Sequence, residues 1–99
     1  MPQPDEPHYQ LTVVAAMLEV HPNKIRSYER RGLVQSHLRE GARLYSERSV
    51  QRLRRILSAT QMGVNLSGAE VVCNLLERIH RLEEDIEILR EQLRRTLEA

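Results

Sequence analysis

The sequence predicts a mostly α-helical chain with a winged helix-turn-helix head and a long C-terminal coiled-coil dimerisation helix. Two short amphipathic segments joined by about three residues are typical of a helix-turn-helix. Two extended segments around a glycine-containing loop follow them, as expected for a wing. The last part of the chain lacks Gly and Pro and repeats apolar residues roughly every 3.5 positions. We expect a disordered tail over 1–8, the head over 9–69 and the coil over 70–99.

Composition narrows the class of protein before any motif is considered. Apolar residues make up 40% of the chain and aromatic residues 3%, so the core must be small and aliphatic. A single cysteine excludes an intrachain disulfide, which suits a reducing cytoplasm. The sequence contains no run of about 18 apolar residues to span a membrane, and its first residues lack the features of a secretory signal. We therefore expect a cytoplasmic, nucleoid-associated protein, with a proline-rich start that predicts the disordered tail.

The helix-turn-helix is expected in the first third of the chain. Its first helix covers about residues 11–19, with Thr12 as the N-cap. The second helix begins at Pro22 or Asn23, because proline is well tolerated in the first turn of a helix. It ends before Gly32, a residue that commonly terminates helices.

The wing and two further helices are expected after this motif. Extended pieces at 33–34 and 42–45 surround a polar loop and predict a hairpin. Ser46 has the position of an N-cap for a third helix, whose apolar residues recur at helical spacing. Gly63 ends that helix, and Ser67 is expected to cap the fourth helix.

An apolar stripe along the fourth helix has spacings of 4, 3, 4, 3 and 4 residues, which is a heptad pattern. Burying these side chains is worth roughly 10 kcal/mol per chain as an upper estimate, and the head is too small to cover them. A second copy is the natural cover, so we expect a homodimer; a helix folded back on its own head is the alternative. Charge pairs permit parallel and antiparallel pairing alike. The stripe consists of Leu75, Ile79, Leu82, Ile86, Leu89 and Leu93.

Positive charge is concentrated in the middle of the chain. Residues 21–55 carry ten Lys or Arg against three Glu, a net charge of +7, whereas 1–20 and 56–99 each carry −3. Together with a helix-turn-helix, such a block predicts a phosphate-binding surface and double-stranded DNA as the partner. A solvated charged face is the alternative interpretation.

Three separated motifs resemble those of the MerR family of transcription regulators. They are IRSYERRGL at 25–33, ARLYS at 42–46 and VxxL at 50–53, and the resemblance covers about residues 9–66. It implies an antiparallel dimer coil. The HP dipeptide at 21–22 and GVNLSG at 63–68 are similar to the heat-shock repressor branch. That similarity implies a repressor of chaperone genes at inverted repeats, with a DnaK-type chaperone as corepressor.

Candidate DNA-contacting residues lie on the second helix, the wing and the third helix. Asn23, Lys24 and Ser27 occupy the exposed early face of the second helix and are assigned to base reading, since Asn suits adenine and Lys suits guanine. A simple capping role is the alternative for Asn23. Ser27 stands where many relatives of the family have an aromatic residue. The candidates for backbone contacts, largely implied by the resemblance, are Arg26, Tyr28, Arg43, Tyr45 and Arg48.

Two of these backbone candidates have a second interpretation. Tyr28 also suits the core, with its hydroxyl at the rim, and Arg43 also suits a surface salt bridge. For Tyr28 the two roles are compatible, whereas for Arg43 the salt bridge is an alternative to the contact with DNA.

The sequence shows no motif for catalysis, cofactor binding or metal binding. It contains no nucleophile–base pair and no Gly-rich phosphate loop, so we predict that the protein is not an enzyme. The histidines lack ligand spacing, and Cys73 is expected to be a small buried residue rather than a metal ligand or redox switch. Two other functions stay open: a chaperone-modulating adaptor that docks through 63–67 and the coil, and a MerR-type regulator of other genes. A ligand-gated activator would need a pocket that a chain of this length has little room to build.

Overall fold

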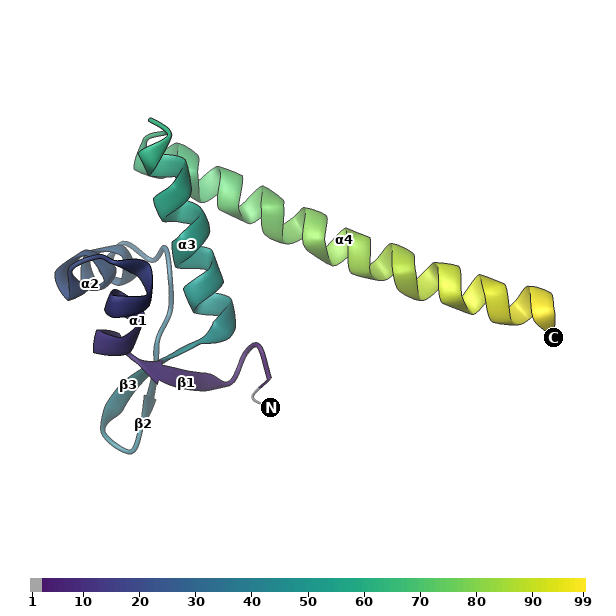
Figure 1. Cartoon of the computed structure of the whole chain (residues 1–99), viewed down its shortest axis with the longest axis horizontal. Coiled ribbons are helices and arrows are strands. Elements are labelled where there is room, and N and C mark those ends of the chain that lie inside the picture. The colour runs from purple at the N-terminus through teal and green to yellow at the C-terminus, as the bar shows by residue number, and fades with distance from the viewer. Residues whose placement is uncertain (1–2) are drawn as a thin grey trace.

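The computed structural model describes residues 3–99 and confirms the predicted fold class (Figure 1). A small head is followed by one long helix that extends away from it, so the molecule measures 55 × 37 × 20 Å. None of the helices within the described part is long and apolar enough to cross a membrane. In chain order the elements are β1 (Pro7–Gln10), α1 (Leu11–Leu18), α2 (Pro22–Arg30), β2 (His37–Arg39), β3 (Ala42–Ser46), α3 (Glu47–Gln61) and α4 (Leu66–Glu98).

The sheet contains one strand that the sequence analysis did not predict. Its order is β1-β3-β2, with both pairs antiparallel, so the second strand of the wing is central. Strand β1 begins at Pro7, inside the segment expected to be a disordered tail; residues 1–2 of that tail lie outside the described part. Proline is compatible with the start of an edge strand, and pairing with β3 supplies the order that local composition does not.

The helix-turn-helix forms as predicted, but its caps differ. Helix α1 begins at Leu11 directly after β1, and its cap position, Gln10, makes no side-chain capping bond, so Thr12 is not the N-cap. Helix α2 is capped by His21, whose Nδ1 accepts a hydrogen bond from the Asn23 amide at 3.0 Å. After α2, Gly32 has a φ of 76°, the left-handed conformation in which glycine is favoured.

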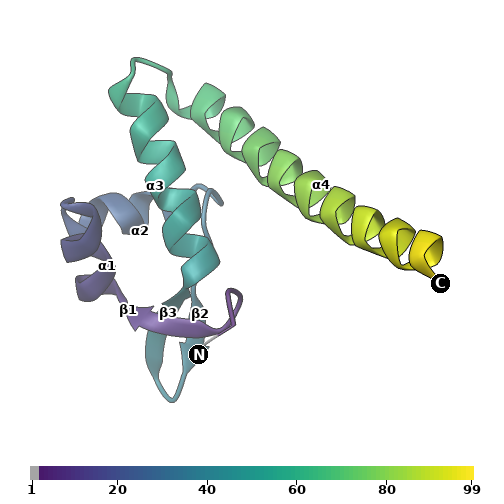
Figure 2. The ribbon, with the colours of Figure 1, turned by 45° about the vertical axis from the view of Figure 1, so that its right-hand side comes forward.

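The wing is a tight hairpin that projects from the head at the end opposite the α3–α4 corner (Figure 1, Figure 2). Arg39 pairs with Ala42, so only Glu40 and Gly41 form the loop. Both have positive φ, 49° and 82°, which is the requirement of a type I′ turn.

Helix α4 begins earlier than predicted and belongs partly to the head. Its cap is Asn65, whose side chain accepts from the Gly68 amide at 2.8 Å, so Ser67 lies within the first turn instead of capping it. Ala69 and Cys73 are fully buried, and α4 packs along α3. The expected boundary between 69 and 70 therefore falls inside a packed interface, and Cys73 is the buried residue that was predicted.

The core is small and mainly aliphatic, as the composition predicts, but it also contains the rings of Tyr28 and Tyr45. Ser46 caps α3 as predicted, with its hydroxyl accepting from the Ser49 amide at 3.1 Å. The inward faces of α1, α2, α3 and β3 meet the first turns of α4 in one cluster. Its buried members are Val14, Ala15, Ile25, Tyr28, Leu33, Val34, Tyr45, Val50, Leu53, Ile56, Leu57, Ala59, Ala69 and Cys73.

Candidate DNA-binding interface

Helix α2 presents a polar face to solvent because its two apolar side chains are fixed in the core. Ile25 and Tyr28 are buried, whereas Asn23, Lys24 and Arg26 are exposed. Ser27, the third residue assigned to base reading, is half-buried at the edge of this face. The face offers amide, ammonium and guanidinium groups on a rigid helix, and those groups match the edges of bases and the phosphates of DNA.

The Asn23 side chain is available for recognition because His21 caps the helix in its place. The alternative of a capping role for Asn23 is therefore wrong. Its Oδ1 instead accepts from Nη1 of Arg26 at 3.3 Å. This contact orients the amide and the guanidinium on the same exposed surface.

The cations of the head and those of α4 differ in their pairing. Of the ten Lys and Arg in 21–55, Arg43, Arg48 and Arg52 form ion pairs. Across the described residues the other seven form none, so their charge is not neutralised by the protein. On α4, three of the five arginines, Arg90, Arg94 and Arg95, pair with glutamates of the same helix, and the described residues give Arg78 and Arg81 no ion pair. The seven are Lys24, Arg26, Arg30, Arg31, Arg39, Arg54 and Arg55.

A network centred on Glu29 connects α2 to the wing. The Tyr45 hydroxyl donates to Oε2 of Glu29 at 3.4 Å, and Nη1 of Arg43 lies 4.0 Å from Oε1. Arg43 also donates to the Ser36 hydroxyl at 3.1 Å. Among the described residues, Oε1 of Glu29 is the buried side-chain atom that lacks a hydrogen bond. Burial, followed by the negative charge of Glu29, raises the pKa of Tyr45.

Burial changes the assignment of Tyr45 and agrees with the core interpretation of Tyr28. Tyr45 is only 1% exposed, so the structure contradicts the expected contact of its side chain with phosphate or sugar. Its ring is core, and its hydroxyl holds Glu29 in place between α2 and the wing. Tyr28 is 7% exposed, and its ring belongs to the core. The contact of its hydroxyl with the DNA backbone stays a prediction, because a core ring and a rim hydroxyl are compatible.

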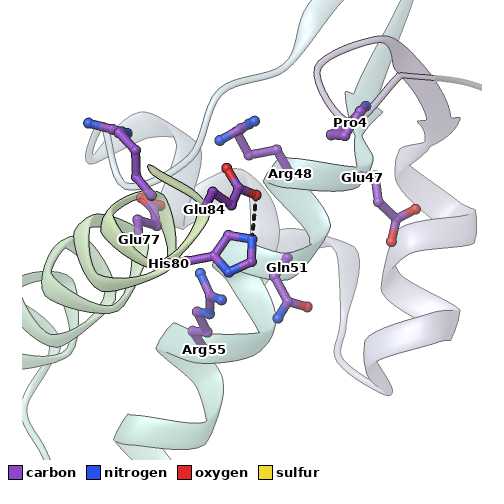
Figure 3. Close-up of a pocket in the computed structure, with 9 residues that line it drawn as sticks. Pro4, Glu47, Arg48, Gln51, Arg55, Glu77, His80 and Glu84 are labelled. Atoms are coloured by element: carbon purple, nitrogen blue, oxygen red, sulfur yellow. Dashed lines mark ion pairs between the residues drawn. The ribbon is translucent and has the colours of Figure 1, made fainter. Parts of the chain in front are cut away.

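Arg48 lies apart from the other candidate residues. Figure 3 shows it at the groove between α3 and α4, whereas α2 lies on the side of α3 away from α4 (Figure 1). Its guanidinium pairs with Asp5, and its backbone N–H donates to the Pro4 carbonyl at 3.0 Å. It lines a groove of about 430 Å³ together with Gln51, Arg55, Glu77, His80 and Glu84 (Figure 3). The structure therefore does not bring Arg48 together with the α2 face.

Arg52 ties the head to α4, a role that sequence reasoning missed. Its side chain is 18% exposed, and Nη1 donates to Glu77 Oε1 at 2.6 Å and to Asn74 Oδ1 at 2.8 Å. Its Nε donates to the carbonyl of Leu33, just after α2. The partners are 19 to 25 positions away along the chain, so no local pattern could have identified them.

The six residues predicted for dimerisation lie on α4 as one exposed line, 47 to 62% exposed in the single chain. Within residues 3–99, no three His, Cys, Asp or Glu side chains are grouped closely enough to hold a metal ion.

Comparison with known proteins identifies sequence relatives. A family model described as MerR HTH family regulatory protein matches residues 9–76. The heat shock protein named HspR from Streptomyces coelicolor is 33% identical over 81 residues, covering 80% of this chain and 54% of that protein. The transcriptional regulator ZntR from Escherichia coli is 34% identical over 91 residues, covering 86% of this chain and 63% of that protein. The chain thus spans between half and two thirds of the length of these relatives.

Two solved structures share the arrangement of head and long helix. A MerR family transcriptional regulator from Bacillus cereus superposes with a TM-score of 0.61 at 19% identity, covering 90% of this chain and 74% of the other. HiNmlR, a MerR family regulator lacking the sensor domain and solved bound to promoter DNA, gives 0.61 at 16% identity, covering 91% and 78%. At these identities the similarity establishes the fold alone.

Proposed function

Because the chain belongs to the MerR HTH family of regulatory proteins, we propose that it is a dimeric repressor of chaperone and heat-shock genes that binds an inverted repeat in double-stranded DNA. Members of this family are DNA-binding transcription regulators and not enzymes. The similarity to HspR supports the heat-shock assignment. A position in the cytoplasm, on the nucleoid, follows from this role.

The observation that carries the proposal is the unpaired polar face of α2 beside the wing. In a helix-turn-helix the second helix enters the major groove and its early residues meet base edges. Asn23 and Lys24 are exposed there and are the base-reading residues of the proposal, with Ser27 at the edge. Arg26 and Arg43 supply phosphate contacts, which fix the orientation of the head on the duplex. The Glu29 network holds α2 and the wing in one geometry, so both can contact the same half-site.

Two heads are required to read an inverted repeat, because the symmetry of the operator mirrors that of the protein. The exposed stripe of α4 supports an antiparallel coiled-coil homodimer. A DnaK-type chaperone is proposed as corepressor, docking on the segment 63–67 at the α3–α4 corner. Gly63 and Asn65 are exposed there, whereas Val64 and Leu66 pack partly against the core. If the corner and the coil served only this docking, the protein would be an adaptor; the unpaired cations of α2 favour DNA binding.

A second candidate function is the regulation of other genes. ZntR is as similar to this chain as HspR, so the set of regulated genes is the part of the proposal that most needs a test.

Selection from a random duplex pool tests the function directly. The dimer is incubated with the pool, with and without a purified DnaK-type chaperone, and the bound fraction is sequenced. We expect an inverted repeat to be enriched, and the chaperone to increase retention of that sequence at least several-fold. A chaperone that leaves retention unchanged would remove the corepressor from the proposal. An unselective pool together with tight chaperone binding would establish the adaptor function in its place.

A further inference from the structure

The stripe of α4 is a surface that the fold leaves without a partner. Cys73 is buried on the other side of the helix, and Glu77 is tied to Arg52 of α3 there. At 3.6 residues per turn, these two lie about half a turn away from the stripe, which runs from Leu75 to Leu93. The head is therefore attached to the opposite face of α4, and the six side chains of the stripe are 47 to 62% exposed. Most of α4 extends away from the head (Figure 1).

The six positions of the stripe are symmetric about Glu84. Leu82 and Ile86 lie two positions from it on either side, Ile79 and Leu89 five, and Leu75 and Leu93 nine. When a helix lies antiparallel to its own copy with the two-fold axis at a given residue, each side chain faces the one equally far on the other side. An axis at Glu84 thus sets every stripe residue opposite another stripe residue.

We propose that two copies of α4 pair antiparallel with the two-fold axis at Glu84. Leu75 packs against the partner's Leu93, Ile79 against the partner's Leu89, and Leu82 against the partner's Ile86. The inference rests on the antiparallel dimer of the proposed function and adds the register, which fixes how far apart the two heads stand.

Shifting the helices by one heptad breaks the match in either direction. In one shift Leu93 faces the partner's Gly68, and Leu89 faces the partner's Val72. In the other shift Ile79 faces the partner's Thr96, and Leu75 faces none of the six. Each alternative exchanges Leu–Leu or Ile–Leu contacts for poorer ones, whereas the central register keeps all six.

Charge opposes the central register, and its effect is the smaller one. With the axis at Glu84, the side chains of Glu83 and Asp85 flank the seam beside their own copies. The two shifted registers would instead pair Arg78 with the partner's Asp85, or Glu83 with the partner's Arg90. Exposed ion pairs contribute less than the burial of a leucine or isoleucine side chain. The apolar match therefore decides the register.

Disulfide cross-linking distinguishes the three registers. Cys73 is first removed by the substitution Cys73→Ser, and one pair of cysteines is then introduced into this background for each register. Ile79→Cys with Leu89→Cys reports the central register, Leu75→Cys with Ile86→Cys one shift, and Leu82→Cys with Leu93→Cys the other. Within each pair the two positions are about 15 Å apart along one helix, too far for an intrachain disulfide.

After mild oxidation, we expect the Ile79→Cys/Leu89→Cys variant to run as a covalent dimer on non-reducing gels, at least tenfold more abundant than for the other two pairs. A dominant cross-link in either shifted pair overturns the register, as does efficient cross-linking of Ile79→Cys alone, which reports parallel pairing. Circular dichroism of the reduced variants checks that each one folds.

Binding of the unmodified chain to its selected duplex is measured separately. If that binding is intact while a shifted pair cross-links, the register is wrong and the proposed function stands. If the unmodified chain binds no duplex, the proposed function fails whatever the cross-linking pattern.

Discussion

Arg26 is the residue through which the candidate interface is most directly tested. It is exposed on α2, forms no ion pair with the described residues, and is oriented by Asn23. We expect Arg26→Ala to weaken binding to all duplexes alike and to reduce the slope of log affinity against log salt by about one. Fluorescence anisotropy titrations at several salt concentrations measure both.

Arg90→Ala is the matched control, because Arg90 pairs with Glu87 far from α2. It should leave affinity and slope unchanged. Equal affinity of Arg26→Ala and the unmodified chain would show that this face of α2 does not contact DNA.

Burial governs the chemistry of Cys73. Removal from water is the main cause that raises the pKa of its thiol, and Arg52 opposes it in part. Because the thiolate is the reactive form, we expect alkylation by iodoacetamide at pH 8 to be roughly tenfold or more slower in the folded than in the urea-unfolded protein. Stability linked to the protonated thiol is complete below the unfolded pKa and is lost as pH rises towards the folded one. Similar alkylation rates in the two states would contradict this burial.

For single residues, the sequence predicted burial correctly within helices and incorrectly for Tyr45 in the wing. The exposed face of α2 and the burial of Cys73 follow from helical periodicity, which is local. Tyr45 was assigned to DNA because the motif places it in the wing, yet its hydroxyl reaches Glu29, sixteen positions earlier in the chain. Contacts between distant segments decide whether a side chain points inward, and a single sequence does not contain them.

Among the elements, the wing has the most specific local requirement. Its two loop residues have positive φ, which glycine adopts freely and glutamate does not. Replacing Gly41 by Ala should lower the free energy of unfolding by about 1 kcal/mol. Glu40→Asn should raise it by a few tenths, because asparagine tolerates the left-handed conformation better.

Urea unfolding at fixed protein concentration measures both changes, with Glu40→Ala as the control for loss of the charge. A Gly41→Ala variant as stable as the unmodified chain would mean that the turn is not type I′ in solution.

Element boundaries show where sequence information ends. The end of α2 was predicted because Gly32 terminates helices locally, and the start of α3 was predicted because Ser46 caps it. Strand β1 was missed because its order comes from pairing with β3, about 36 positions away. The start of α4 was placed too late because Asn65 competes with Ser67 for the same capping role, and both are good N-caps.

For the whole molecule, the charges near the proposed two-fold axis give a prediction whose sign depends on the register. The double substitution Glu83→Gln/Asp85→Asn neutralises the two carboxylates and removes two like-charge contacts across the proposed seam, each costing roughly 0.5 kcal/mol. We therefore expect the dissociation constant of the variant dimer to be several-fold lower than that of the unmodified dimer. The dissociation constant of the unmodified dimer should also fall as the salt concentration increases. Sedimentation equilibrium at low and high salt measures both effects.

Glu87→Gln is the control for this pair, since Glu87 is exposed on α4 and pairs within its own helix. A weaker dimer in the Glu83→Gln/Asp85→Asn variant would indicate that these carboxylates face Arg78 or Arg90 of the partner, as in the shifted registers.

The heptad spacing predicts a dimer, which stays a prediction, whereas the attachment of the head to α4 could not be predicted from the sequence. The sequence placed a boundary at 69–70, whereas Ala69 and Cys73 are part of the head core. The stripe and the buried residues lie on different faces of the same helix. Only the packing against α3 shows which face of α4 joins the head.

Because α4 passes from the core of one head into the proposed seam as one continuous helix, it rigidly fixes the distance and the angle between the head and the seam. Each residue between Cys73 and Glu84 adds about 1.5 Å to the length of the helix and rotates it by roughly 100° about its axis. One alanine inserted between Cys73 and Leu75, ahead of the stripe, would thus rotate the two heads of the proposed dimer out of phase with the duplex, whereas seven residues would nearly restore the phase and move each head about 10 Å outwards. The number of residues between the head and the proposed two-fold axis would therefore set the distance between half-sites that the dimer can bind.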